Sequence, residues 1–142
     1  MKKSLHQRRE EFLSGTLKYY TKDINRRCVS ENETCFYSPL SADKVGQTDG
    51  CAIGRWLKPE LQLRLDNCTK NIVSVDDIFN QLPTVLKNLG QNFLSSCQGL
   101  HDSSANWEKK GLSVEGRYTV SEIIKIYDLN PDKFSKWLTK NI

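Results

Sequence analysis

The chain carries one candidate pair for nucleophilic catalysis, a cysteine and a histidine. Cys51 opens a predicted short helix over residues 51–57, and a helix N-terminus lowers the pKa of a thiol and favours the nucleophilic thiolate. His101 would act as the base, with Asp102 or Asp49 orienting its imidazole. The spacing permits such a dyad without being specific for one, and the apolar residues after the cysteine also allow a thiol that points into the core. A Cys-His thiol enzyme with catalytic Cys51, His101 and Asp102 is one hypothesis.

Four of the thiol and imidazole side chains offer an alternative role, as metal ligands: Cys28, Cys35, Cys51 and His101. Structural zinc sites use cysteine pairs separated by about two to four residues, because a short knuckle presents both thiolates to one ion. Here six residues separate Cys28 from Cys35, and fifteen separate Cys35 from Cys51. The spacing therefore favours buried free thiols, which are common in protein cores, and we expect no cofactor.

Two glycines flank the helix start at Cys51. The segment 50–55 lacks the spacing and the lysine-hydroxyl pair of a phosphate-binding loop. We instead expect a tight turn at Gly50 and the close approach of another element at Gly54.

The C-terminal residues 119–142 read as helix, short turn, helix, with Thr119 or Ser121 capping the first helix and Asn130 the second. This pattern resembles the helix-turn-helix of small DNA-binding domains, such as those that end some phage antirepressors. The resemblance implies a groove-facing second helix. Two helices that simply pack on the core are the alternative. The residues that would contact nucleic acid are Lys133, Lys136 and Lys140, with Arg8 and Arg9 of the N-terminal helix assisting.

Hydrophobic periodicity predicts a mostly α fold with a small β-hairpin (α+β), arranged as one compact domain of short helices over residues 1–142. The expected parts are a basic amphipathic helix at 3–21, a hairpin and loop at 26–50, a helical core at 51–110 and the helix pair at 119–142. Ser74 is the expected N-cap of a helix over 75–82.

The net charge of +4 is unevenly distributed along the 142 residues. Residues 1–27 carry +5, residues 28–130 carry −3 and residues 131–142 carry +2. Basic ends can attract nucleic acid or an acidic protein surface. The alternative is a solvated amphipathic helix at each end.

The composition and the number of cysteines bear on the cellular compartment in which the protein is expected. No apolar run approaches the roughly 18 residues of a membrane-spanning helix, and no apolar stretch follows the basic start as in a secretory signal. Five cysteines are an odd number, which argues against a disulfide framework. We therefore expect a cytoplasmic protein without membrane association.

Several motifs together resemble an uncharacterised family of small bacterial and phage proteins. They are Cys35-Phe36-Tyr37, the segment 50–57, Ser74-Val75, the stretch from Phe93 to His101-Asp102, and Trp107. The resemblance covers about residues 28–110 and carries no known activity. It implies a compact accessory domain in which Cys51, Gly54, His101 and Asp102 cluster as a structural or binding feature.

The leading functional hypothesis is a non-enzymatic binding module, a phage or mobile-element accessory protein that engages a host macromolecule. A host protein, inhibited or regulated by the module, is the expected partner. The alternatives are a DNA-binding regulator that uses the C-terminal helices, and the Cys-His thiol enzyme. The sequence leaves the oligomeric state open.

Overall fold

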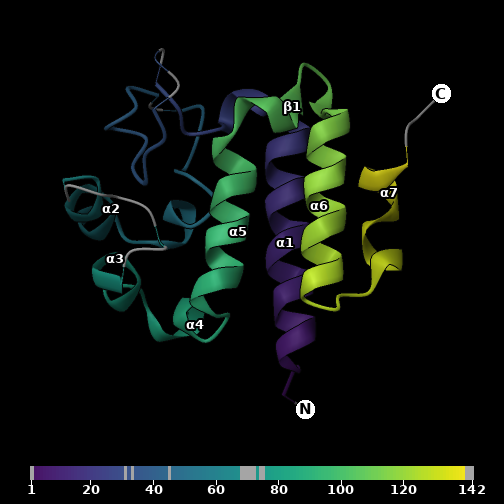
Figure 1. Cartoon of the computed structure of the whole chain (residues 1–142). Coiled ribbons are helices and arrows are strands. Elements are labelled where there is room, and N and C mark those ends of the chain that lie inside the picture. The colour runs from purple at the N-terminus through teal and green to yellow at the C-terminus, as the bar shows by residue number, and fades with distance from the viewer. Residues whose placement is uncertain are drawn as a thin grey trace. The chain divides into compact units, whose positions relative to one another are not determined.

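The computed structural model describes residues 2–30, 32, 34–44, 46–67, 73 and 76–139. These residues form a mostly α structure with a small antiparallel hairpin (Figure 1), which confirms the predicted fold class. By its internal contacts the chain groups into two compact units. Unit 1 comprises residues 1–24 and 103–142, and unit 2 comprises residues 25–102. The single domain expected from the sequence stays a prediction.

The longest helix of unit 1 is α1 (Leu5–Lys22), and it confirms the helix predicted over 3–21. Its start is fixed by a reciprocal capping box. The Ser4 hydroxyl accepts the Gln7 N–H, while the Gln7 side chain accepts the Ser4 N–H. The apolar positions recur at helical spacing and are buried, namely Phe12, Leu13, Leu17 and Tyr20.

Unit 1 also contains the regular hairpin of the described residues. A 3-10 turn (Ser104–Asn106) leads into β1 (Trp107–Glu108), which pairs antiparallel with β2 (Gly111–Leu112). Gly111 takes a φ of +129°, which L side chains rarely adopt, so glycine lets the chain close directly after the two turn residues. This hairpin was not predicted from the sequence.

The predicted hairpin within 26–50 is only partly formed. An isolated antiparallel bridge joins Val29 to Cys35. Pairing then ends, because the N–H groups of Tyr37 and Ser38 donate to the carboxylate of Asp66 at 2.7 and 2.9 Å. Backbone donors used by a side chain are lost to a strand ladder.

The first C-terminal helix, α6 (Val114–Ile126), begins earlier than predicted. Its N-cap is Ser113, whose hydroxyl accepts the Gly116 N–H at 3.0 Å. The predicted caps, Thr119 and Ser121, are wrong because both lie inside the helix. The Thr119 hydroxyl donates instead to Oδ1 of Asn106 at 3.0 Å.

The second C-terminal helix is much shorter than a recognition helix. Asn130 caps the segment as predicted, since its side chain accepts the Asp132 N–H at 3.0 Å. The 3-10 turn that follows (Pro131–Phe134) passes into α7 (Ser135–Leu138), a single helical turn of four residues. Four residues span only about 6 Å, which is too short to read a DNA groove as a helix-turn-helix does.

Unit 2 is a set of short helices around an apolar core. The elements are a 3-10 turn (Gly54–Trp56), α2 (Pro59–Asp66), α3 (Asp76–Asn80), α4 (Thr84–Lys87) and α5 (Gln91–Asp102). The helix predicted over 51–57 is thus a 3-10 turn, and the predicted N-cap Ser74 lies outside the described residues. Core side chains that are almost fully buried include Tyr37, Ile53, Leu65, Ile78, Phe93, Leu94 and Leu100.

The predicted close approach at Gly54 is confirmed, and Gly50 adopts a backbone conformation that favours glycine. Gly50 has a φ of +123°, and a Cβ on Gly54 would lie 2.2 Å from the backbone oxygen of Tyr37. Across the described residues, no helix is both long and apolar enough to cross a membrane.

Candidate functional site

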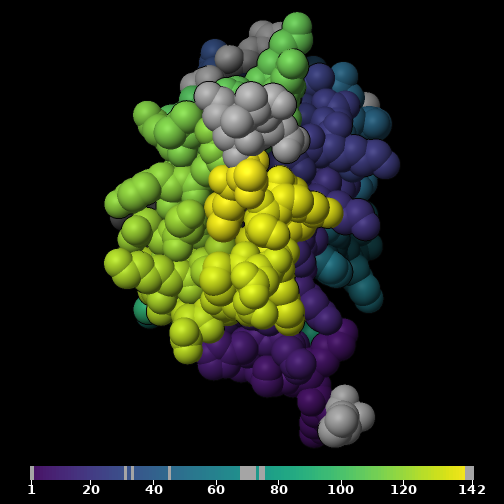
Figure 2. Space-filling view, turned by 90° about the vertical axis from the view of Figure 1, so that its right-hand side faces the viewer, coloured from purple at the N-terminus to yellow at the C-terminus, as the bar shows by residue number. Residues whose placement is uncertain are grey.

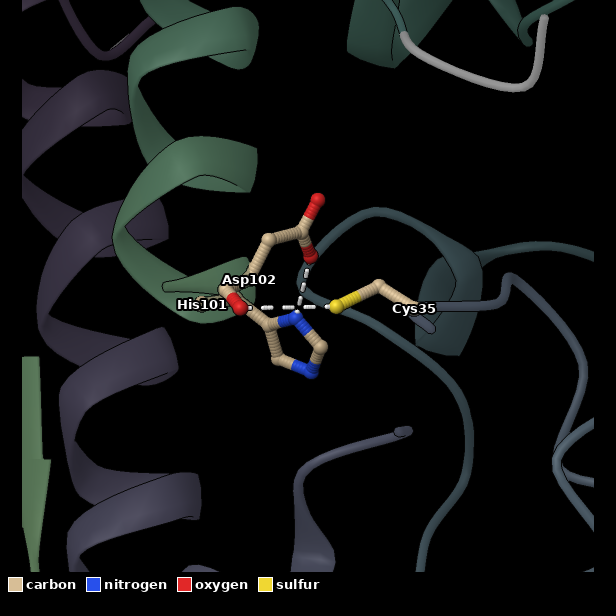
Figure 3. Close-up of side chains that lie close together, drawn as sticks. All are labelled: Cys35, His101 and Asp102. Carbon is tan, nitrogen blue, oxygen red and sulfur yellow. Dashed lines mark hydrogen bonds and ion pairs between the residues drawn. The ribbon is translucent and has the colours of Figure 1, made fainter. Parts of the chain in front are cut away.

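The strongest cluster of potentially reactive side chains lies in unit 2, at the C-terminal end of α5. Donor atoms of Cys35, His101 and Asp102 all lie within 4.8 Å of one another (Figure 3). His101 is fully buried and Cys35 is half-buried. The predicted metal set contained Cys35 and His101. Asp102 was predicted as a catalytic partner and, from the family resemblance, as a member of a structural or binding cluster with Cys51, Gly54 and His101.

Both ring nitrogens of His101 are occupied. Nε2 accepts the Cys28 backbone N–H at 3.0 Å, and Nδ1 lies 2.7 Å from Oδ1 of Asp102. Since Nε2 accepts, Nδ1 carries the proton and donates it to the carboxylate. Burial lowers the pKa of His101 and outweighs the opposing effect of Asp102, so the ring stays neutral. A ring bonded in this way has no lone pair for a metal ion or for a catalytic proton.

The neighbouring contacts fasten the end of α5 to the segment 27–35. The Arg27 guanidinium donates from Nε to the backbone oxygen of His101 at 2.8 Å and from Nη2 to that of Asp102 at 3.0 Å. The Cys35 thiol donates to the same Asp102 oxygen at 3.5 Å. The last carbonyls of a helix have no partner within the helix. These contacts satisfy them, which gives the cluster a structural role.

Cys51, the predicted nucleophile, forms a hydrogen bond with the backbone of Gly54. Cys51 is 1% exposed, and its Sγ accepts the Gly54 N–H at 3.3 Å. Burial, with a contribution from Asp102, raises the pKa of the Cys51 thiol well above its usual value. A thiol with a raised pKa is protonated near neutral pH, which is the opposite of what a nucleophile needs.

The thiols also fit a metal ion poorly. The Cys28 thiol donates to the backbone oxygen of Ser38 at 3.4 Å, and burial raises its pKa to about 12. Burial raises the pKa of Cys35 as well. Cysteine binds metal as the thiolate, so ionisation of these buried groups would oppose binding.

The predicted nucleic-acid-binding residues have different environments in unit 1. The Lys133 ammonium lies 2.8 Å from Oε1 of buried Glu10, and it therefore fastens the C-terminal segment to α1. Arg9 stacks over the ring of Tyr127 at 5.0 Å. Arg8 is exposed, whereas Lys140 lies outside the described residues.

Lys136 lines a pocket of about 220 Å³ in unit 1. The cations around it come from three elements: Lys110 from the hairpin turn, Arg117 from α6 and Lys136 from α7. Figure 2 shows this side of unit 1, with the C-terminal segment in yellow over α1 and α6. The other described lining residues are Thr21, Gly111, Leu112, Trp137 and Thr139, and no described lining residue is acidic.

Internal contacts hold the pocket walls in place. The Trp137 indole N–H donates to the Thr21 hydroxyl at 3.3 Å, and the Lys136 ammonium lies 4.5 Å from the centre of the same indole ring. Arg117 donates from Nη1 to the backbone oxygen of Leu112 at 3.1 Å. The indole, an ammonium and a guanidinium are therefore positioned before any ligand arrives. Of these pocket residues only Lys136 was predicted from the sequence as a binding residue, whereas Lys110, Arg117 and Trp137 were not.

The pocket belongs to the basic part of the molecule. Unit 1 contains 13 Lys and Arg against eight Asp and Glu, a formal charge of +5. Unit 2 contains eight against nine, a formal charge of −1. Most of the positive charge at the two ends of the sequence thus belongs to unit 1, whereas Arg26 and Arg27 belong to unit 2.

Comparison with known protein families, curated proteins and solved structures found no match to this chain.

Proposed function

We propose that this protein is a non-enzymatic binding module that binds single-stranded nucleic acid through unit 1. The observation that carries the proposal is the pocket that Lys110, Arg117 and Lys136 line together with Trp137, with no acidic residue in the described lining. The sequence already favoured a binding module that engages a macromolecule. A host protein as the partner, and a phage or mobile-element origin, stay predictions.

Charge supports an anionic partner. Lys and Arg bind phosphates and release condensed counterions, which supplies most of the affinity of sequence-independent nucleic-acid binding. Unit 1 carries +5 and unit 2 carries −1, so the attraction is directed to unit 1.

The aromatic residues of unit 1 favour single-stranded over double-stranded nucleic acid as the partner. Proteins that bind single strands combine a basic surface with aromatic side chains on which bases stack. Trp137 lines the basic pocket, and Tyr118 on α6 is 67% exposed. A duplex keeps its bases stacked on each other and offers few of them to such rings.

The geometry disfavours the two sequence-based alternatives. The four-residue α7 is too short for the recognition helix of a DNA-binding regulator, and Lys133 is engaged by Glu10. A Cys-His enzyme would need Cys51 as a thiolate and His101 with an available nitrogen. Neither condition fits the buried thiol and the doubly bonded ring.

Fluorescence anisotropy with a labelled single-stranded 12-mer, repeated at several salt concentrations, tests the proposal. We expect binding at low salt that weakens linearly in a log–log plot, with a slope of about −0.7 per neutralised phosphate. Lys136→Ala should make this slope shallower by about 0.7. The matched control Lys58→Ala, an exposed lysine of unit 2, should leave it unchanged. Absence of binding at low salt, or duplex binding stronger than single-strand binding, would contradict the proposal.

A further inference from the structure

We infer that the pocket of unit 1 binds the terminal phosphate monoester of a nucleic-acid strand, with the adjoining nucleotide against Trp137. This inference rests on the proposed function and deepens it, because it assigns a chemical group to the pocket. The module would then recognise strand ends in addition to its general attraction for the backbone.

The size of the pocket limits what can enter. Pockets for complete small-molecule ligands usually enclose about 300–1,000 Å³, whereas this one encloses about 220 Å³. The space suits one chemical group at the end of a larger molecule. A strand that continues in both directions would have to leave the pocket again, and a terminal group does not.

The charge of the pocket lining favours a phosphate monoester over a phosphodiester. Lys110, Arg117 and Lys136 bring three positive charges to the pocket, and the described lining has no carboxylate to offset them. A phosphodiester within a strand carries a single negative charge, whereas a phosphate monoester carries about −1.5 to −2 near pH 7. The ligand that best compensates three cations is therefore the monoester, which occurs only where a strand ends.

The donor geometry suits a tetrahedral oxyanion. A guanidinium has five N–H donors, and the bond from Arg117 to the Leu112 oxygen uses one of them at Nη1. Lys110 and Lys136 add ammonium donors from two other elements, so oxygens of one phosphate can be approached from different directions. The pairing of a planar guanidinium with phosphate oxygens is strong and directional.

The indole provides the wall for the attached nucleotide. Trp137 is half-buried, and its N–H is bonded to Thr21, which fixes the orientation of the ring. A base or sugar next to the phosphate can pack against the exposed part of this ring without a sequence-specific contact. Recognition would depend on the strand end and little on the base at that end.

Three forms of one labelled 12-mer test the inference, all measured by anisotropy with the wild-type protein. They carry a 5′-phosphate, a 3′-phosphate or hydroxyl groups at both ends, and the label is placed away from the end under test. We expect at least one phosphorylated form to bind about tenfold more tightly than the hydroxyl form, as charge-assisted hydrogen bonds predict. The form that gains affinity identifies which end enters the pocket.

Two lysine variants test whether the affinity gained from a terminal phosphate arises in the pocket. Lys110→Ala should reduce the ratio of affinities between phosphorylated and hydroxyl forms by about three- to tenfold. We expect no larger effect, because Lys110 is exposed and solvent screens the charge of its ammonium group. Its sequence neighbour Lys109 is also exposed in the same turn but does not line the pocket, so Lys109→Ala should preserve the ratio. Both substitutions lie in a solvent-exposed turn, and equal melting temperatures would verify that the fold is kept.

The outcomes separate this inference from the proposed function. If all three forms bind with equal affinity, the proposed function stands and the terminal-phosphate assignment is wrong. If none binds at low salt, both fail. A phosphoserine peptide that displaces the hydroxyl 12-mer as effectively as the phosphorylated strand does would also overturn the assignment, because the pocket would then serve a phosphoprotein.

Discussion

Replacing His101 by Gln is expected to remove a large part of the pH dependence of folding stability between pH 7.5 and 5.5. In the folded protein the ring is fully buried and neutral, with Nε2 accepting from Cys28 and Nδ1–H donating to Asp102. Burial lowers its pKa below the ordinary value of 6.5. In the unfolded chain the same imidazole is hydrated and takes up a proton as the pH falls through about 6.5.

The sign follows from proton linkage. The unfolded state binds more protons than the folded state, so the stabilising contribution is present above pH 6.5 and is lost as the pH falls. If the folded ring stays neutral over the whole interval, the free energy of unfolding drops by about 1.4 kcal/mol between pH 7.5 and 5.5. The hydrogen bond to Asp102 acts in the opposite direction, but it is the smaller effect.

Urea unfolding at a series of pH values measures this contribution. The wild-type protein should lose up to about 1.4 kcal/mol over the interval, and His101→Gln should lose clearly less while being less stable throughout. His6→Gln, at the exposed second histidine, is the matched control for the loss of an imidazole. Equal slopes for wild type and His101→Gln would refute the assignment of a buried neutral ring.

Three further substitutions test other contacts. Gly116→Ala places a Cβ 2.0 Å from the Asn106 backbone oxygen and should cost about 1–3 kcal/mol or more. Gly99→Ala, at an exposed position of α5, meets nothing within 4 Å and should stabilise by up to about 1 kcal/mol; melting temperatures that move in the same direction would contradict this. Burial opposes ionisation of Glu10, but hydrogen bonds from Lys133 and the Asn130 N–H lower its pKa overall. Its stabilising contribution is therefore lost as the pH falls through about 4.5 and below, and Glu10→Gln should flatten acid unfolding in that range. A thiol reagent at neutral pH should label Cys51 only on unfolding, because its thiol is buried and its pKa is raised; rapid labelling of the native protein would restore the enzyme hypothesis.

Elements whose signals are local were predictable from the sequence. The helix α1 combines a capping residue at Ser4 with apolar residues at helical spacing. The helix α2 begins at Pro59, and proline is over-represented at the first helical position. The start of α6 was not predictable in this way. Gly116 reads as a helix-weakening residue, yet it is required because the first helical turn lies against the Asn106 oxygen. The hairpin at 107–112 has strands of two residues, too short for an alternating pattern to register.

Residue types alone could not separate a reactive cluster from a structural one. The sequence shows that Cys51, His101 and Asp102 exist, but not that a backbone N–H of Cys28 occupies the imidazole nitrogen that a base would need. Such a bond joins positions 73 residues apart and depends on the tertiary fold. The hairpin turn at Lys109 and Lys110, in contrast, carries a local signal in the sequence, the glycine that follows it at position 111.

In each element that lines the basic pocket, one contact or backbone conformation holds the cation in position. Lys110 lies in a two-residue turn that closes because Gly111 can adopt a φ of +129°. Arg117 is held by the oxygen of Leu112, so the guanidinium of α6 and the hairpin are positioned together. Lys136 reaches the pocket because the short α7 is fastened at Trp137 to Thr21 of α1, and the preceding 3-10 turn is fastened at Lys133 to Glu10. Under the proposed function Lys133 acts on binding indirectly: Lys133→Ala should weaken nucleic-acid binding by loosening the segment that carries Lys136 and Trp137. This effect should appear together with a lower melting temperature, whereas Lys136→Ala should weaken binding with little change in stability, since an exposed ammonium over an indole contributes only about 0.5–1 kcal/mol.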